Sequence, residues 1–199
     1  SQGVQVYDGR PVSELAQMSS DNGHRSSWGV RDPDQKWSLS RSPGPRIECR
    51  SAAGNLLWET TAPALLPMSC AYHLDRKRLA VSAGYELGEI EVPSGKSIRQ
   101  YDARPHLAGP IYRLAYSSDG KRLGCLSGGR LTVLKTQPSV TIWDVETGKL
   151  LSHKPIDKPF EEAERPWFSQ DLSQIVCTNV DPVTRDVKGF RLWDTATGK

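Results

Sequence analysis

The four histidines of this 199-residue chain are the first candidates for metal chemistry. They are His24, His73, His106 and His153. No two of them share a metal-ligand spacing such as HExxH, so the sequence predicts no metal site. His73 falls in a predicted turn between two strands, where we expect it to be solvated. His106 and His153 fall in predicted connectors.

The cysteines and one Gly-Lys-Ser turn complete the candidates for chemistry. None of the four cysteines forms a CxxC pair, and each lies in an apolar run, which predicts buried free thiols. Gly95-Lys96-Ser97 imitates the end of a phosphate-binding loop, but the earlier glycine of that motif is replaced by Ile90. The segment also joins two predicted strands and opens no helix. We therefore predict a hairpin turn with Gly95 at positive φ, and no cofactor.

Two markers recur along the chain at steps of about 40 to 50 residues. Glycine turns that follow an apolar run occur at Gly54, Gly95, Gly148 and Gly198, which gives steps of 41, 53 and 50 residues. Aspartate turns between two apolar runs occur at 34, 75, 119 and 171, which gives steps of 41, 44 and 52. The aspartates are interpreted as turn formers that hydrogen-bond their own backbone. Two markers with one period predict a repeat protein.

The best copies of the repeat carry a family resemblance. They are VTIWDVETGKLL at 140–151, FRLWDTATGK at 190–199 and LAYSSDGKRLGCLS at 114–127. The Trp-Asp pairs and Thr-Gly-Lys turns resemble the WD40 family of β-propellers, strongly over 111–199 and more weakly over 1–58. The resemblance implies an all-β fold of four-stranded antiparallel blades. We expect a half blade at 1–16 and blades at about 26–60, 67–100, 110–152 and 165–199, which favours an incomplete propeller.

The resemblance also implies structural roles for a few residues. Trp143 and Trp193 should pack between blades, next to Asp144 and Asp194. His24, which follows a glycine, matches a family position whose histidine joins a buried network of Ser or Thr, Asp and the Trp of the pair. The network needs an aspartate in the turn before the Trp-bearing strand, and Asp186 is the one candidate, so we assign the complete network to no blade.

Composition restricts the function. The net charge is +3, with Lys and Arg interleaved with acidic residues, so we expect no nucleic-acid partner. No apolar run approaches the roughly 18 residues of a membrane span. With no recognisable signal peptide and no N-x-S/T sequon, we expect a cytoplasmic protein without a membrane partner. The resemblance suggests a non-catalytic scaffold for protein partners. The alternative is a propeller domain attached to an enzyme, where it gates or positions substrate for a catalytic domain outside this chain.

Long loops are the expected partner-binding surface. They are the segments 128–139, 179–188 and 153–165, and insertions in repeat arrays gather on the binding face. The predicted partner-binding residues are Arg130, Leu131 and Lys135 in the first loop, Asp181, Arg185 and Asp186 in the second, and Lys158, Phe160, Glu161 and Arg165 in the third.

Overall fold

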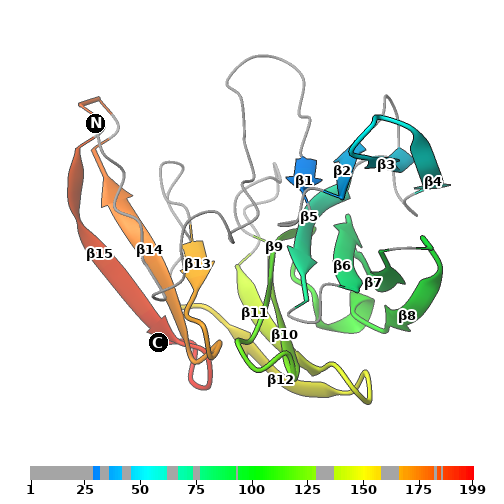
Figure 1. Cartoon of the computed structure of the whole chain (residues 1–199). Coiled ribbons are helices and arrows are strands. Elements are labelled where there is room, and N and C mark those ends of the chain that lie inside the picture. Colours follow the sequence, from blue (N-terminus) through cyan, green and yellow to red (C-terminus); the bar gives the residue numbers. More distant parts are fainter. Residues whose placement is uncertain are drawn as a thin grey trace. The chain divides into compact units, whose positions relative to one another are not determined.

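Fifteen β-strands and one short 3-10 turn make up the described part of the chain (Figure 1). The computed structural model describes residues 29–31, 36–41, 46–61, 67–73, 77–92, 94–128, 137–157, 166–181, 183–184 and 186–199. The chain divides into two units, Ser1–Thr61 and Ala62–Lys199. Each is described by itself.

The described residues of the first unit form one sheet, called the first sheet. Its strands pair antiparallel in chain order: β1 (Gly29–Arg31), β2 (Trp37–Arg41), β3 (Arg46–Ser51) and β4 (Leu56–Thr61). Ile47 and Cys49 alternate with Glu48 and are buried, whereas Glu48 forms an ion pair with Arg50 at 2.8 Å. This alternation is the pattern of a strand with one apolar face.

The second unit contains three further antiparallel sheets. The second sheet is β5 (Pro67–Tyr72), β6 (Arg78–Ala83), β7 (Glu86–Glu91) and β8 (Ser97–Tyr101). The third sheet is β9 (Ile111–Tyr116), β10 (Arg122–Ser127), β11 (Ser139–Asp144) and β12 (Leu150–Pro155). The fourth sheet is β13 (Pro166–Phe168), β14 (Gln174–Val180) and β15 (Val187–Asp194). The predicted all-β class with four antiparallel sheets is confirmed.

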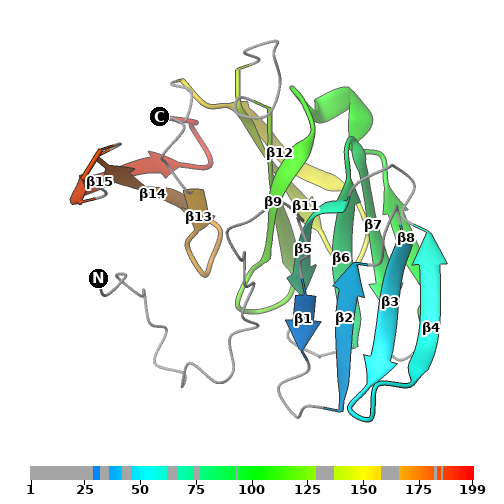
Figure 2. The same ribbon diagram turned by 90° about the horizontal axis from the view of Figure 1, so that it is seen from above.

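The third sheet lies between the second and the fourth, and has an apolar core on each side (Figures 1 and 2). On one side Leu123 and Trp143 pack with Leu87 of the second sheet. On the other side Ile142 packs with Trp193 of the fourth. Because both faces of the third sheet are covered, β10 and β11 are nearly continuous runs of buried residues. Burial on two faces explains why these strands lack a polar alternation.

The turns follow the sequence prediction. Gly54, Gly95, Gly148 and Gly198 all have positive φ, between 69° and 83°. At Gly198 (φ 77°) an added Cβ would also collide with the backbone of Pro155. Glycine is therefore favoured there both by the backbone conformation and by the lack of space for a side chain.

The predicted aspartate turns are confirmed where they are described. Asp119 Oδ1 accepts the backbone N–H of Lys121 at 3.0 Å, and Asp171 Oδ1 accepts that of Ser173 at 3.0 Å. Asp34 and Asp75 lie outside the described residues. Each described carboxylate therefore supports its own turn, as the sequence indicated.

Three strand ends extend into segments that the sequence predicts as loops. β12 continues to Pro155, so His153 lies in a strand and not in a connector. β14 continues to Val180 and β15 begins at Val187, so the loop between them is shorter than 179–188. Cross-strand pairs such as Thr141–His153 and Val180–Val187 hold these extensions. Within the described residues, no helix has the length and apolarity needed to cross a membrane.

Candidate functional site

The two Trp-Asp pairs form matching hairpin corners. Asp144 Oδ1 accepts the backbone N–H of Thr147 at 2.6 Å, and Asp194 Oδ1 accepts that of Thr197 at 2.8 Å. The hydroxyl of Thr147 adds a further bond to Asp144, and these bonds hold the pKa of Asp144 below its usual range. Both carboxylates therefore stabilise the turns that follow their strands. The adjacent tryptophans have a different role, which is packing between sheets.

Both tryptophan rings are buried between sheets, at 2% and 5% exposure. Trp143 Nε1 donates to Thr141 Oγ1 at 3.2 Å and its ring lies edge-on to Tyr101, 5.5 Å away. Trp193 carries the Arg191 guanidinium over its ring at 4.9 Å. Of the hydrogen-bond network that the resemblance implies, Thr141 and Trp143 are together. His24 lies outside the described residues, and Asp186 is exposed in the loop between β14 and β15.

His73 is buried, at 7% exposure, so the prediction of a solvated ring is wrong. Its Nε2–H donates to the carbonyl of Gly120 at 2.9 Å, and its ring lies edge-on to Tyr116, 4.8 Å away. Gly120 has φ 71°, and an added Cβ would overlap the imidazole. His73 therefore links the turn after β9 to the second sheet. Because the two residues are 47 positions apart, the local sequence does not predict this contact.

A buried carboxylate, Glu89, is the main polar group that the sequence analysis missed. It lies in β7 at 0% exposure. Tyr101 Oη donates to Glu89 Oε2 at 2.8 Å, and Tyr116 Oη donates to Oε1 at 2.5 Å. Arg99 Nε is 3.8 Å from Oε2. The two tyrosines come from different sheets, so Glu89 joins the second sheet to the third. We call Glu89, Arg99, Tyr101 and Tyr116 the Glu89 cluster.

The sequence contains a signal for Glu89 itself, though none for its tyrosine partner in the third sheet. β7 is ELGEIE, and Leu87 and Glu89 share one face of it. Leu87 is fully buried, so a charged residue two positions later on the same face requires partners. Arg99, which pairs with Glu89 across β7 and β8, supplies one. Its Nη2 also donates to the Glu146 carbonyl at 2.7 Å, and so reaches the third sheet.

The cysteines are buried free thiols, as predicted. Burial raises the pKa of Cys49 to about 11 and those of Cys70 and Cys125 to about 12. A thiol with so high a pKa is protonated at neutral pH and is a poor nucleophile. These residues pack as small apolar side chains.

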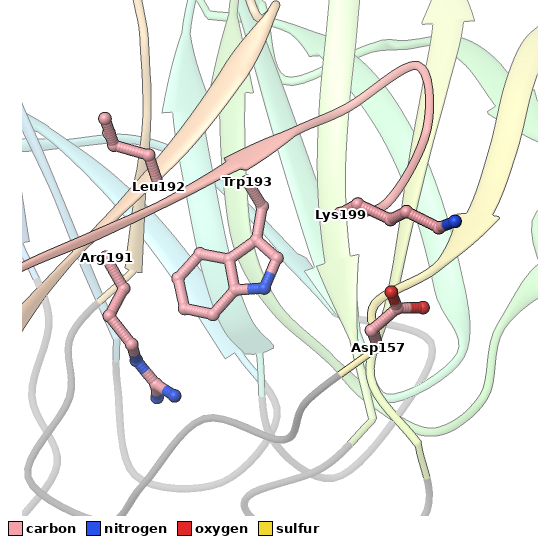
Figure 3. Close-up of a pocket in the computed structure, with 5 residues that line it drawn as sticks. All are labelled: Asp157, Arg191, Leu192, Trp193 and Lys199. Carbon is pink, nitrogen blue, oxygen red and sulfur yellow. The ribbon is translucent and has the colours of Figure 1, made fainter.

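A hollow of about 370 Å³ lies beside the end of β15. It is lined by Asp157, Arg191, Leu192, Trp193 and Lys199. Figure 3 shows the Trp193 indole between the Arg191 guanidinium on one side and Asp157 and Lys199 on the other. Two cations, one carboxylate and an indole suit contact with a polar side chain of another molecule. The described lining offers no nucleophile next to a base.

The loop between β14 and β15 contains the predicted partner-binding residues that the structure describes, Asp181 and Asp186. Asp181 Oδ1 accepts the backbone N–H groups of Val183 at 2.7 Å and Thr184 at 2.9 Å. Its Oδ2 is 2.5 Å from Lys188 Nζ, and this ammonium, with the two N–H groups, lowers the pKa of Asp181. Val183 is 86% exposed at the tip. The loop is therefore held in shape by its own polar groups and presents an apolar side chain.

The other predicted partner-binding residues lie outside the described part of the chain. They are Arg130, Leu131, Lys135, Lys158, Phe160, Glu161, Arg165 and Arg185. Asp181 and Asp186 share one loop, where Asp181 N–H donates to the Asp186 carbonyl at 2.8 Å.

Comparison with known proteins supports the fold. No protein-family model matches the chain, and no curated protein matches it. Among solved structures, the backbone resembles that of hydrazine synthase from Kuenenia stuttgartiensis, with a TM-score of 0.61 over 84% of this chain and 13% sequence identity. The match covers 45% of that protein, so this chain spans less than half of its length. At this identity the likeness shows the fold alone.

Proposed function

We propose that this chain is a segment of a WD40-type β-propeller and acts as a non-catalytic scaffold for protein partners. The Trp-Asp corners and the stacked antiparallel sheets support the family assignment. Among the described residues, the polar side chains discussed above have structural roles, and this supports a non-catalytic function. Asp144 and Asp194 hold turns, His73 binds a backbone carbonyl, and the thiols are buried.

The observation that carries the proposal is the loop between β14 and β15. Asp181 orders it through two backbone bonds and the Lys188 ion pair, while Val183 is 86% exposed. A loop that is already ordered loses little conformational entropy on binding. An exposed apolar residue in a loop that also contains Asp181, Asp186 and Lys188 has the composition of an interface anchor. The proposed partner is a protein, in contact with this loop and the two other long loops; we propose a cytoplasmic location.

The experiment is affinity capture with two variants of the chain, a loop variant with three substitutions and a lysine variant with two. Phe160→Ala with Arg165→Ala, combined with Val183→Ala, removes side chains from the proposed binding loops. Lys121→Ala with Lys149→Ala alters exposed lysines in the turns beside Asp119 and Asp144. The loop variant should lose captured proteins that the lysine variant retains. Loss in the lysine variant alone would place binding on the other loops. Turnover of a substrate by the purified chain would contradict the non-catalytic role.

A further inference from the structure

Two histidine rings lie next to each other beside the buried indole of Trp143. The ring centroids of His106 and His153 are 5.9 Å apart, and the ring planes are inclined by 55°. His106 ends the 3-10 turn Arg104–His106, which connects the second sheet to the third, and His153 lies in β12. The two histidines are far apart in the sequence, so no spacing motif marks the pair.

The third sheet positions both rings. Trp143 is buried, and its Nε1 donates to Thr141 Oγ1 at 3.2 Å. Thr141 is also the cross-strand partner of His153 in the pairing of β11 with β12. The Trp143 indole in turn lies 6.0 Å from the His106 ring and is inclined to it by 64°. One Thr-Trp pair therefore positions both imidazoles, which lowers the entropy cost of binding a ligand between them.

The separation of the rings fits two imidazoles that share one metal ion. A metal–nitrogen bond of about 2.1 Å places the centroids of two ligating rings about 5 to 6.5 Å apart, as the bond angle at the metal opens from tetrahedral to linear. The observed 5.9 Å lies within this range. His153 is exposed and His106 is partly buried, so an ion can reach the pair from solvent.

We propose that His106 and His153 form a two-ligand site for a divalent transition-metal ion that prefers imidazole nitrogen, the class of Ni²⁺, Cu²⁺ and Zn²⁺. Within the described residues no third histidine, cysteine or carboxylate joins them, so we expect water in the remaining coordination positions. Ca²⁺ and Mg²⁺ are disfavoured because they prefer oxygen ligands. The bound ion ties the connector after β8 to β12 of the third sheet.

The charged groups around the pair are compatible with a bound cation. Partial burial, and then His106 and Lys154, lower the pKa of His153, so its ring is neutral at neutral pH and offers a lone pair to a metal. Lys154 follows His153 in β12 and so lies on the opposite face of the strand. The Arg104 guanidinium is paired with Glu86. This inference does not rest on the proposed function, because none of the residues proposed to bind a protein partner takes part in it.

Isothermal titration calorimetry of the whole chain with Ni²⁺ at neutral pH tests the site. His106→Ala and His153→Ala should each weaken Ni²⁺ binding at least about 30-fold, because even the hydrogen-bond partners of metal ligands contribute about 10- to 100-fold. Lys154→Ala is the matched control and should bind Ni²⁺ at least as tightly as the wild type, since it removes a nearby positive charge. A wild-type chain that binds no Ni²⁺ up to about 1 mM, or a loss in only one of the two histidine variants, would overturn the proposal.

Electron paramagnetic resonance of the Cu²⁺-loaded wild-type chain keeps the test decisive if a variant does not fold. The spectrum should show coupling of Cu²⁺ to the nitrogens of two imidazoles, and coupling to a single imidazole would contradict the site. The double variant His106→Ala with His153→Ala should lose this signal, and it retains His24 and His73 as a measure of background binding. Ni²⁺ should also raise the Tm of the wild type but not of the double variant, because an ion that binds the folded chain stabilises it. An equal rise in both would overturn the proposal.

Discussion

The two sheet interfaces of the second unit have the same geometry but opposite chemistry. Between the second and third sheets, Glu89 is buried and receives hydrogen bonds from Tyr101 and Tyr116. Between the third and fourth sheets, the aligned position is Ile142, which packs in an apolar core with Trp193. One backbone arrangement therefore accepts either a satisfied carboxylate or an aliphatic side chain.

The difference matters for what each interface tolerates. The apolar interface depends on close packing, which other side chains of similar volume can provide. The Glu89 cluster depends on each donor meeting its acceptor, since a buried polar group without a partner is costly. We therefore expect the second–third interface to discriminate more sharply between partner sheets than the third–fourth interface does.

The largest loss of stability is expected when the buried tryptophan of either interface is removed. Trp143→Ala and Trp193→Ala should each lower the free energy of unfolding by about 3 to 5 kcal/mol, because each empties a buried indole site. Urea denaturation followed by circular dichroism measures this. Trp167→Ala is the control, and its exposed ring should matter by less than about 1 kcal/mol in the monomer. A loss below about 1 kcal/mol for Trp143→Ala would mean that the ring is not in the core.

Glu89→Gln should come next, with a loss of about 1 to 3 kcal/mol. Glutamine offers one acceptor oxygen, so the hydroxyl of Tyr101 or Tyr116 loses its acceptor and Arg99 loses its counter-charge. Glu146→Gln is the control, because that side chain is exposed and only its carbonyl binds Arg99.

A variant that makes the second–third interface apolar sharpens this comparison. The triple change Glu89→Leu, Tyr101→Phe and Tyr116→Phe removes both hydroxyl donors together with their acceptor, while the partly exposed Arg99 keeps its bond to the Glu146 carbonyl. It should therefore cost less than Glu89→Gln, since no buried hydroxyl is left unpaired. A triple variant that loses clearly more stability than Glu89→Gln would show that the cluster contributes beyond satisfying its own members.

Alkaline pH should loosen the interface that contains Glu89. Burial first, and then the Glu89 carboxylate, raise the pKa values of Tyr101 and Tyr116. Unfolded tyrosine ionises near pH 10. The folded state therefore keeps protons that the unfolded state releases, and stability falls as the pH rises above about 10. Tyrosinate absorbance should show these two residues ionising with unfolding, and Tyr101→Phe with Tyr116→Phe should remove that delayed component.

The smallest change in stability is expected at acidic pH, from protonation of Asp171 in the turn between β13 and β14. Asp171 accepts the N–H of Ser173 and the hydroxyls of Ser169 and Ser173, which lower its pKa to about 2. The lowered pKa contributes stability above about pH 4 that is lost as the pH falls through about 2. Carboxyl NMR should place the Asp171 midpoint near 2. A midpoint near 4 would show that these bonds do not form in solution.

Much of the architecture could be predicted because it depends on local chemistry. Gly95, Gly148 and Gly198 mark turns, since positive φ favours glycine. Asp119 and Asp171 mark the complementary turns by bonding their own backbone. Apolar runs between these turns located the strands to within a few residues. The burial of Trp143 and Trp193 followed from their place at the end of such runs.

The tertiary structure alone decided which polar residues became interior. His73 is next to a turn, where sequence favours exposure, yet it is buried because the carbonyl of Gly120 comes from another sheet. Glu89 is a charged residue in a strand, and its partner Tyr116 is 27 residues away. The repeat spacing predicts which strands form one sheet, but it does not predict which side chains of adjacent sheets are in contact. Packing between adjacent sheets determines which buried donor meets which acceptor, so only the folded unit shows these pairs.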